Sequence, residues 1–595
     1  MGVASFLFLP NLSGAQQPDA DPDAQPEASQ PQVQDQNQAA SVSVSGEGSR
    51  IPVRGLVRNA LTGEPLVRAL VRVEGDAATG ALTDGEGRFE ISGLPVGPQI
   101  FEVRKPGFYD RPATASDEEQ DATGSAHNVL VAAQMPELIF SLAPAGAIRG
   151  QIVLSTGDPA QGFAVELLRR TIVDGRAVWQ MASTTKTNSE GIYRFAGLTA
   201  GAYVLYTEPA MESEAATSLV EPGSGGAVVR SGYASVFYPD TRDLAGAAKI
   251  QIAGGEQVQA NFALKLEPFH AVSAVAVFPR GGSSPSEAEG NLTATVLDSA
   301  SHRLPYAAQV DPATHTIQTT LPDGSYVLLL TAQPQDQNRV LRGRYYSVSS
   351  VPNFGTLAGS AQLSISGHAV TNLRIPLSIL PTPQVQLTEL HSGEQTGKTG
   401  QGSIEVMASQ TGEWISDGLT TSYAQKMQPG ANPAAALSPG SYWVSAFTSS
   451  SGFCEQSFTA AGSSLAREPL TVSFTGTAPL MELILRDDCA RLTLSLPQSL
   501  TATPPGEEPY YTVYAVPNFD TTAGVEALTL RPSSGGTVTL DGLTPGNYRV
   551  YTFEGPAQLE YRNPAALAAL PIPGQAVTLS PGMESNLVLE VPESR

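Results

Sequence analysis

Leu198-Thr199-Ala200-Gly201-Ala202-Tyr203 reads L-x-x-G-x-Y, and this pattern recurs along the 595-residue chain. Further copies begin at Leu321, Leu437 and Leu543, and a degenerate copy places Leu94 three residues before its glycine. Successive leucines are about 105 to 125 residues apart, which is the size of one compact domain rather than of a solenoid repeat. The repeats therefore predict an array of five similar domains.

The alternation of apolar and polar side chains indicates β-strands. It is clear in Val71-Arg72-Val73-Glu74, Arg88-Phe89-Glu90-Ile91 and Tyr548-Arg549-Val550-Tyr551. No run of about 10 to 18 residues has a clean 3.6-residue apolar period bounded by helix caps. The 57 glycines and 46 prolines suit many short strands joined by tight turns. We predict an all-β chain of tandem antiparallel β-sandwich domains. The expected domain ranges are 49–144, 145–268, 269–380, 381–487 and 488–595.

The segment before the first domain has the composition of an export signal followed by a tether. An apolar stretch from Val3 to Leu9 precedes Ser13-Gly14-Ala15, a small-x-small pattern typical of signal peptidase sites. Residues 16–48 are rich in Gln, Asp, Pro, Ala and Ser, so they bury too little apolar surface to offset the entropy of ordering. We expect a signal-peptide remnant over 1–15 and a disordered tether over 16–48.

Charge and hydropathy restrict the partners. The formal net charge is −23, so nucleic acid would meet a repulsive field. No stretch approaches the 18 apolar residues of a membrane-spanning helix. We expect an exported protein of the cell envelope, periplasm or extracellular space that binds no nucleic acid and has no transmembrane segment. A repeated array of this kind is expected to be an elongated monomer whose partner is a polysaccharide or an envelope protein.

Two hairpins resemble a known family. Thr83-Asp84-Gly85-Glu86-Gly87-Arg88-Phe89 and Thr187-Asn188-Ser189-Glu190-Gly191-Ile192-Tyr193, each followed by Gly-Leu-x-x-Gly and a new strand, are similar to the same parts of carboxypeptidase regulatory-like domains. The resemblance implies a transthyretin-like, or Cna-B-like, β-sandwich, a fold related to carbohydrate-binding modules. It covers the first two domains well and is weaker in the last three, which lack this hairpin.

The family's name invites a search for a zinc peptidase site. The chain has one H-x-x-E sequence, His391-Ser392-Gly393-Glu394. His391 is the last of the six histidines, so no downstream imidazole completes a zinc site. We therefore predict no catalytic residues, metal or cofactor and expect a non-enzymatic scaffold or binding protein. A peptidase-associated protein is the remote alternative.

Aromatic residues suggest the second functional alternative, carbohydrate binding. Exposed rings on β-sandwiches stack on sugars, and the three candidates are Trp179, Trp414 and Trp443. Trp443 follows Tyr442 in a strand, so if Tyr442 faces the core, Trp443 faces outward. Packing against a neighbouring domain explains Trp443 equally well.

The two cysteines, Cys454 and Cys489, fit neither a disulfide-rich scaffold nor a four-ligand zinc module. In an oxidising compartment they form either a disulfide near the junction of the last two domains or two separate buried thiols. A bridge would close a loop of about 35 residues and stabilise the fold by about 3 to 4 kcal/mol in the chain-entropy model.

Overall fold

The computed structural model describes the chain from residue 50 to residue 591 with gaps. The described ranges are 50–75, 79–110, 126–212, 219–220, 228–279, 292–299, 302–332, 357–380, 383–392, 404–412, 414–415, 420–425, 429–433, 437, 439–448, 452–473, 479–501 and 505–591. Residues Ser49–Arg595 form one compact unit. The signal remnant and tether expected over 1–48 lie outside the described residues.

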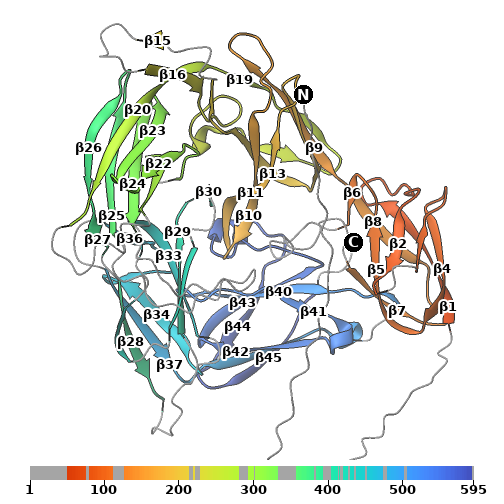
Figure 1. Cartoon of the computed structure of the whole chain (residues 1–595). Helices are drawn as coiled ribbons and strands as arrows, with labels where there is room; N and C mark the ends of the chain where they lie inside the picture. Colours follow the sequence, from red (N-terminus) through yellow and green to blue (C-terminus); the bar gives the residue numbers. More distant parts are fainter. Residues whose placement is uncertain are drawn as a thin grey trace, which may run out of the picture. The chain divides into compact units, whose positions relative to one another are not determined.

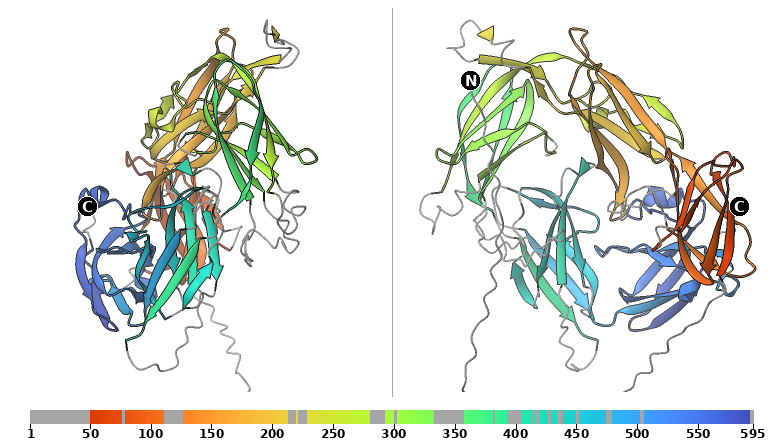
Figure 2. Two further views of the ribbon diagram at one scale, coloured as in Figure 1. Left: turned by 90° about the vertical axis from the view of Figure 1, so that its left-hand side faces the viewer. Right: turned by 45° about the vertical axis from the view of Figure 1, so that its right-hand side comes forward.

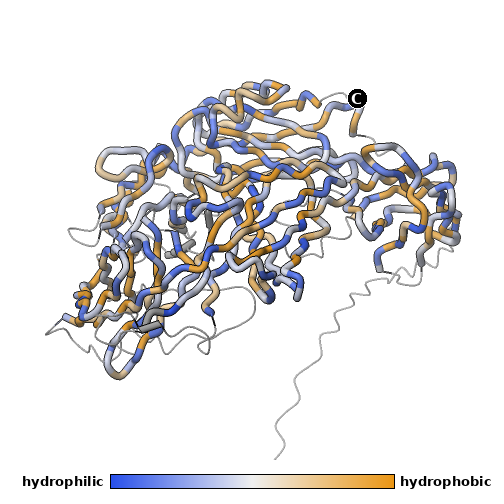
Figure 3. The backbone as a smooth tube through the Cα atoms, turned by 90° about the horizontal axis from the view of Figure 1, so that it is seen from above, coloured by the Kyte–Doolittle hydropathy of each residue, from blue (hydrophilic) through white to orange (hydrophobic). Residues whose placement is uncertain are grey.

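The fold is all-β, as predicted, and the strands form pairs of facing sheets (Figures 1 and 2). Five large clusters of buried side chains fill these pairs. Hydrophobic and hydrophilic residues alternate along many strands, as Figure 3 shows, because successive side chains point to opposite faces. Within the described part of the chain, no helix is long and apolar enough to cross a membrane.

The first domain pairs a sheet of order β4-β1-β8-β6 with a sheet of order β3-β2-β5-β7. Strand β1 pairs parallel with β8 and antiparallel with β4. Phe89, Phe101 and Phe140 pack in its core. The strands are β1 (Arg50–Asn59), β2 (Leu70–Val73), β3 (Gly80–Leu82), β4 (Arg88–Pro95), β5 (Gly97–Arg104), β6 (Phe108–Tyr109), β7 (Ala126–Val131) and β8 (Leu138–Pro144).

The two hairpins that resemble each other in sequence are built alike. The Asp84 carboxylate accepts hydrogen bonds from the backbone N–H groups of Glu86 and Arg88, at 2.9 and 2.8 Å. Asn188 accepts the corresponding bonds from Glu190 and Ile192, at 3.0 and 2.8 Å. A side-chain acceptor therefore fixes each turn and starts the strand that follows.

The second domain contains the longest hairpin, β10–β11, which turns at Asp174 and Gly175. Its sheets have the orders β17-β13-β10-β11 and β12-β9-β18, with β19 also pairing with β9. The strands are β9 (Gly146–Leu154), β10 (Ala164–Val173), β11 (Arg176–Lys186), β12 (Ile192–Leu198), β13 (Gly201–Thr207), β17 (Ile250–Ile252), β18 (Gln257–Gln259) and β19 (Phe262–Leu264), with a 3₁₀ turn at η2 (Leu244–Gly246).

The third domain takes strands from the range expected for the second. Strands β14 and β16 lie within 145–268, yet β16 pairs with β20 in the third domain's sheet. The sequence could not predict this pairing, because the residues of a short strand do not specify which sheet the strand joins. The strands are β14 (Ala210–Met211), β15 (Leu219–Val220), β16 (Val228–Tyr233), β20 (Leu266–Val277), β21 (Leu292–Leu297), β22 (Ala308–Asp311), β23 (Thr316–Pro322), β24 (Gly324–Ala332), β25 (Leu357–Ile365), β26 (Val370–Pro376) and β27 (Ser378–Ile379).

The fourth domain has sheets of order β32-β28-β37-β34-β35 and β31-β29-β33-β36. Its strands are β28 (Gln384–Leu390), β29 (Ile404–Gln410), β31 (Thr420–Gln425), β32 (Gly430–Pro433), β33 (Gly440–Phe447), β34 (Cys454–Ala460), β35 (Ser463–Ser464), β36 (Leu470–Val472) and β37 (Leu480–Arg486). The short strand β30 (Trp414–Ile415) instead pairs with β11 of the second domain.

The fifth domain has sheets of order β42-β38-β45 and β41-β40-β43-β44. Its elements are β38 (Ala490–Ser495), η3 (Gln498–Leu500), β39 (Gly506–Glu507), β40 (Tyr511–Pro517), β41 (Leu528–Leu530), η4 (Pro532–Ser534), β42 (Thr537–Leu543), β43 (Gly546–Glu554), α2 (Pro564–Ala568), β44 (Gln575–Leu579) and β45 (Glu584–Val588). Strand β39 pairs with β7 of the first domain. Domains distant in sequence are therefore in contact, which the expectation of an elongated chain did not include.

The repeated L-x-x-G-x-Y pattern forms the turn into a central strand. Its tyrosine donates a hydrogen bond to the backbone carbonyl four residues earlier: Tyr203 to Thr199 at 2.7 Å, Tyr326 to Pro322 at 3.1 Å and Tyr548 to Thr544 at 2.8 Å. The glycines of the four full copies have φ of 156° or 157°, which L side chains rarely adopt. The pattern thus encodes a strand entry that is locked by its own tyrosine.

Candidate functional site

The three tryptophans belong to one seam between the second and fourth domains. Trp179 on β11 is the backbone partner of Trp414 on β30. The Trp179 side chain is only 3% exposed and packs with Leu168 and Tyr206. It is therefore a core residue rather than a sugar platform. The side chain of Trp414 lies outside the described part of the structure.

Trp443 faces away from its own core, toward the second domain. Tyr442 beside it is buried, and burial raises the pKa of Tyr442 to about 12. The Trp443 ring is half-buried, and the guanidinium carbon of Arg176 lies 3.8 Å from the ring centroid. This is a close cation–π contact, and it places an arginine of the second domain over the face of the ring. This contact agrees with the alternative explanation of Trp443, namely that it packs against a neighbouring domain.

Arg176 extends from a hairpin tip that is anchored in the fifth domain. The Tyr561 hydroxyl donates to the Asp174 carboxylate at 2.5 Å, and Arg562 donates to the same carboxylate at 3.3 Å and to the Asp174 carbonyl at 3.1 Å. The backbone N–H of Arg562 also donates to the Gly175 carbonyl at 3.1 Å. Burial, together with the charge of Arg562, lowers the pKa of Arg176 to about 10, so Arg176 is still protonated at neutral pH.

Arg562 continues from this tip into the fifth domain. Its guanidinium donates to the carbonyls of Thr521 and Thr522, both at 3.2 Å, and its side chain is only 11% exposed. A guanidinium has five N–H donors in a fixed plane, which is why one side chain can hold a carboxylate and several carbonyls together. Arg562 is the hub of the contact between the second and fifth domains.

The tip fits closely enough to require glycine. Gly175 has φ of 68°, and a Cβ placed there would lie 2.7 Å from atoms of the Tyr561 ring. No side chain fits in that space without moving the ring. The turn residue therefore serves two purposes, hairpin geometry and close approach to the fifth domain.

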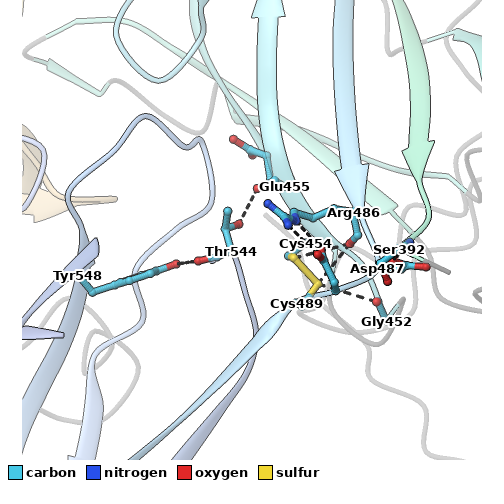
Figure 4. Close-up of a disulfide and its surroundings, with 10 residues drawn as sticks. Ser392, Gly452, Cys454, Glu455, Arg486, Asp487, Cys489, Thr544 and Tyr548 are labelled. Atoms are coloured by element: carbon cyan, nitrogen blue, oxygen red, sulfur yellow. Dashed lines mark hydrogen bonds and ion pairs between the residues drawn. A yellow bond between two sulfur atoms is a disulfide. The ribbon is translucent and has the colours of Figure 1, made fainter. Parts of the chain in front are cut away.

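The fourth and fifth domains share a second polar junction around Glu455. Its buried carboxylate accepts hydrogen bonds from the Thr522 backbone N–H at 2.7 Å and from the Thr522 hydroxyl at 2.5 Å. Burial raises the pKa of Glu455, although these hydrogen bonds oppose the shift. The Thr544 hydroxyl donates to the Glu455 carbonyl at 2.5 Å (Figure 4). Thr544 belongs to the last L-x-x-G-x-Y copy, so the repeat turn also contacts the neighbouring domain.

Cys454 and Cys489 form a disulfide directly beside this junction (Figure 4). Their Cα atoms are 5.8 Å apart, and the bridge joins the start of β34 to the segment that leads into β38. Of the two alternatives for these cysteines, the structure has the bridge. It ties strand β34 of the fourth domain to the residue that precedes β38, the first strand of the fifth domain.

The histidine of the H-x-x-E sequence lies in the same region. His391 Nδ1 is 3.2 Å from the Asp487 carboxylate, and the backbone N–H of Ser392 donates to Asp487 at 2.9 Å. These contacts lower the pKa of Asp487 although burial opposes them. Glu394 lies outside the described residues. Among those described, no group of three His, Cys, Asp or Glu residues is placed to hold a metal ion.

One family model matches part of the first domain. Residues 52–126 match the family model of the carboxypeptidase regulatory-like domain. The first domain resembles this family, as its hairpin predicted. No curated protein matches the chain.

The solved structures to which this chain is similar include several bacterial pilins. A streptococcal ancillary pilin is 12% identical, with a TM-score of 0.18, over 56% of this chain and 99% of its own. The major pilin subunit BcpA of Bacillus cereus is 10% identical, with a TM-score of 0.13, over 58% and 99%. GBS52, the minor pilin of Streptococcus agalactiae, is 16% identical, with a TM-score of 0.16, over 39% and 100%. At such scores these likenesses carry no argument about the function of this chain.

Sequence reasoning missed the residues that join the domains. Asp174, Gly175 and Arg562 were not singled out, and an Asp-Gly pair between two alternating stretches signals only a hairpin turn. Their partners are almost 400 positions away, so no local period or spacing marks the contact. Trp443 was the one residue of the seam whose outward orientation could be derived.

Proposed function

We propose that this chain is a non-enzymatic exported protein that acts as a scaffold or binding module of the cell envelope or extracellular space. The observation that supports this most directly is the position of three side chains that lie between domains. Trp443, Arg176 and Arg562, which are residue types that often bind ligands, are engaged in contacts between domains. Such contacts hold the domains of a scaffold in a fixed mutual arrangement.

The disulfide supports export. Disulfides persist in oxidising compartments and are rare in the cytosol. The test fuses residues 1–48 to alkaline phosphatase, an enzyme that is active only where its disulfides form, in a bacterial host. Activity that disappears when residues 1–15 are deleted supports export. Equal activity with and without those residues contradicts a signal in this segment.

Carbohydrate binding is the second candidate function. Of the three tryptophans proposed to stack on a sugar, Trp179 is buried and the side chain of Trp414 lies outside the described residues, so Trp443 is the one to test. The experiment is depletion of the purified protein, from Gln16 onward, by a panel of insoluble and immobilised polysaccharides. A Trp443→Ala variant is compared with Trp179→Phe, which conserves the core. Selective retention that is lost only in Trp443→Ala would establish a sugar site. If the wild type is retained by no polysaccharide, a protein partner in the envelope is favoured. A peptidase-associated role would then have to be supported by co-purification of the chain with a peptidase.

A further inference from the structure

The contact between the first and last domains contains a buried histidine. His127 on β7 is 3% exposed, and its ring lies between two carboxylates. Nε2 is 2.5 Å from Oδ2 of Asp110, and Nδ1 is 2.7 Å from Oε1 of Glu507. Both ring nitrogens are therefore within hydrogen-bonding distance of a carboxylate oxygen.

The two carboxylates come from different domains. Asp110 follows β6 and belongs to the first domain, as His127 does. Glu507 is on β39, which pairs antiparallel with β7 so that Glu507 lies opposite Val129. The adjacent backbone N–H of Glu508 donates to the Asn128 carbonyl at 2.8 Å. The contact thus consists of a short strand pairing with one buried ionic cluster.

The described residues of β5 and β8 that pack against the imidazole are aromatic. The Phe140 ring of β8 has its centroid 4.5 Å from that of His127, and Phe101 of β5 is the backbone partner of His127. Among the described residues, the charged groups that face the ring are Asp110 and Glu507. The protonation state of His127 therefore changes the net charge of the group formed by His127, Asp110 and Glu507.

Counting protons shows which state of the ring fits. A neutral imidazole has one N–H donor and one lone pair, whereas the imidazolium has two donors. Two carboxylates need two donors, so only the imidazolium satisfies both contacts. In the neutral ring, one nitrogen lone pair would face a carboxylate oxygen beside an imidazole that is only 3% exposed, which is unfavourable.

We propose that the pairing of β7 with β39 is a pH-dependent clasp, in which protonated His127 holds the last domain against the first and deprotonation releases it. The clasp is a property of the fold and does not depend on the function proposed above.

The sign of the pH effect follows from the two partners. Burial lowers the pKa of His127, whereas the hydrogen bonds and charges of Asp110 and Glu507 raise it, and the resulting pKa is above the ordinary value. Asp110 stays beside His127 when the domains separate, so closure adds the burial, which lowers the pKa of His127, and the contact with Glu507, which raises it. The imidazolium alone donates to both carboxylates of the closed contact. Closure of the clasp therefore binds a proton. The contribution of His127 to the stability of the closed clasp is fully present at pH values below the pKa of His127 in the separated domains. This contribution is lost as the pH rises through the higher pKa that His127 has in the closed state.

Hydrogen–deuterium exchange of the full chain tests the clasp. Exchange is measured for peptides covering 126–131 and 505–510 at about pH 5.5 and about pH 8.5, and each rate is divided by its intrinsic value. We expect protection of both peptides to fall at the higher pH. The loss should be about tenfold for each unit by which Glu507 raises the pKa of His127. Equal protection at the two pH values would overturn the proposal.

Three variants distinguish the clasp from general pH effects. Glu507→Gln keeps a polar side chain but removes the interdomain charge, so it should lower the pKa of His127, read by NMR of labelled imidazoles, and shift release to lower pH. His127→Gln should abolish the pH dependence. His302→Gln is the matched control, because its pair with Asp298, at 2.9 Å, lies within the third domain. Wild-type pH dependence in His127→Gln, or an unchanged pKa in Glu507→Gln, would refute the clasp.

Discussion

At the residue scale, one arginine carries much of the contact between domains. Arg562 reaches the Asp174 carboxylate and backbone carbonyls of two segments, and it is almost fully buried. Lysine cannot replace it, because a single ammonium lacks the planar set of donors. The strength of this contact should therefore depend on the guanidinium itself.

Replacing Arg562 with Ala should lower the free energy of unfolding by about 1 to 3 kcal/mol, since buried acceptors lose their donors. The measurement is urea denaturation followed by circular dichroism. Arg467→Ala is the control. Its ion pair with Asp520 is 2.7 Å long, but the Arg467 side chain is 75% exposed, so the loss should stay within about 1 kcal/mol. Equal losses in the two variants would show that Arg562 is not a hub.

Gly175 and Gly157 allow the docking of the hairpin tip to be separated from backbone strain. Both have positive φ, 68° and 87°, but only a Cβ at Gly175 would meet Tyr561, whereas Gly157 has open space. Gly157→Ala should cost about 1 to 2 kcal/mol from the left-handed backbone alone. Gly175→Ala should cost about 1 to 3 kcal/mol more from the steric clash. Thermal unfolding of both variants measures the difference, and its absence would indicate that the tip is not docked.

At the scale of elements, the parts of the fold that could be predicted from the sequence are those that depend on local patterns. Alternating strands and L-x-x-G-x-Y turns are local patterns, so they predicted an all-β chain and its repeating units. The exchange of β16 into the third domain and the pairing of β30 with β11 were not predictable. Each pairing depends on which sheet edge a short strand meets after the chain has folded. A strand of two to six residues does not specify that edge by its sequence.

The tyrosine of the repeat should have a measurable role. Tyr548→Phe removes the hydroxyl that donates to Thr544 and should cost about 1 kcal/mol, the net value of a typical hydrogen bond. Tyr551 is the matched control, since its buried ring makes no hydrogen bond to another described residue. Tyr551→Phe should be close to neutral. Chemical denaturation of the two variants is the measurement, and equal stabilities would contradict the role given to the hydroxyl.

The disulfide should stabilise the fourth and fifth domains. Breaking the bridge between Cys454 and Cys489 opens a loop of about 35 residues and should lower the free energy of unfolding by about 3 to 4 kcal/mol. Denaturation with and without reductant measures this, and a Cys454→Ser/Cys489→Ser variant should match the reduced protein. Mass spectrometry of the untreated chain must show the cross-linked peptides. Free thiols in that spectrum would instead favour the alternative of two separate cysteines.

At the scale of the whole molecule, long-range contacts link domains that a linear reading keeps apart. Asp174 contacts Arg562, Arg176 contacts Trp443, and Glu455 contacts Thr522. The repeated L-x-x-G-x-Y pattern predicted the number of units but not these contacts, because each contact depends on side chains that meet only after the units have folded. The expectation of an elongated chain did not include them.

Because these contacts are shared, the second, fourth and fifth domains should unfold together. Scanning calorimetry of the wild type should show one transition for the three, with a van't Hoff enthalpy well above that of a single domain. Arg562→Ala should divide this transition. Separate transitions for every domain in the wild type would show that the contacts add little coupling.

The long hairpin of the second domain has a consequence for how the protein is made. Asp174 emerges during synthesis 387 residues before its partner Tyr561. At ordinary translation rates this delay is about 20 to 80 seconds, which is long compared with the folding of a small domain. For that interval the hairpin tip is complete but lacks its partners in the fifth domain, so any nascent chain that stops before the last domain leaves Asp174 and Gly175 open to proteases and to other newly made copies. The fifth domain is thus needed to cover the tip of this hairpin, and it can do so only after its own synthesis.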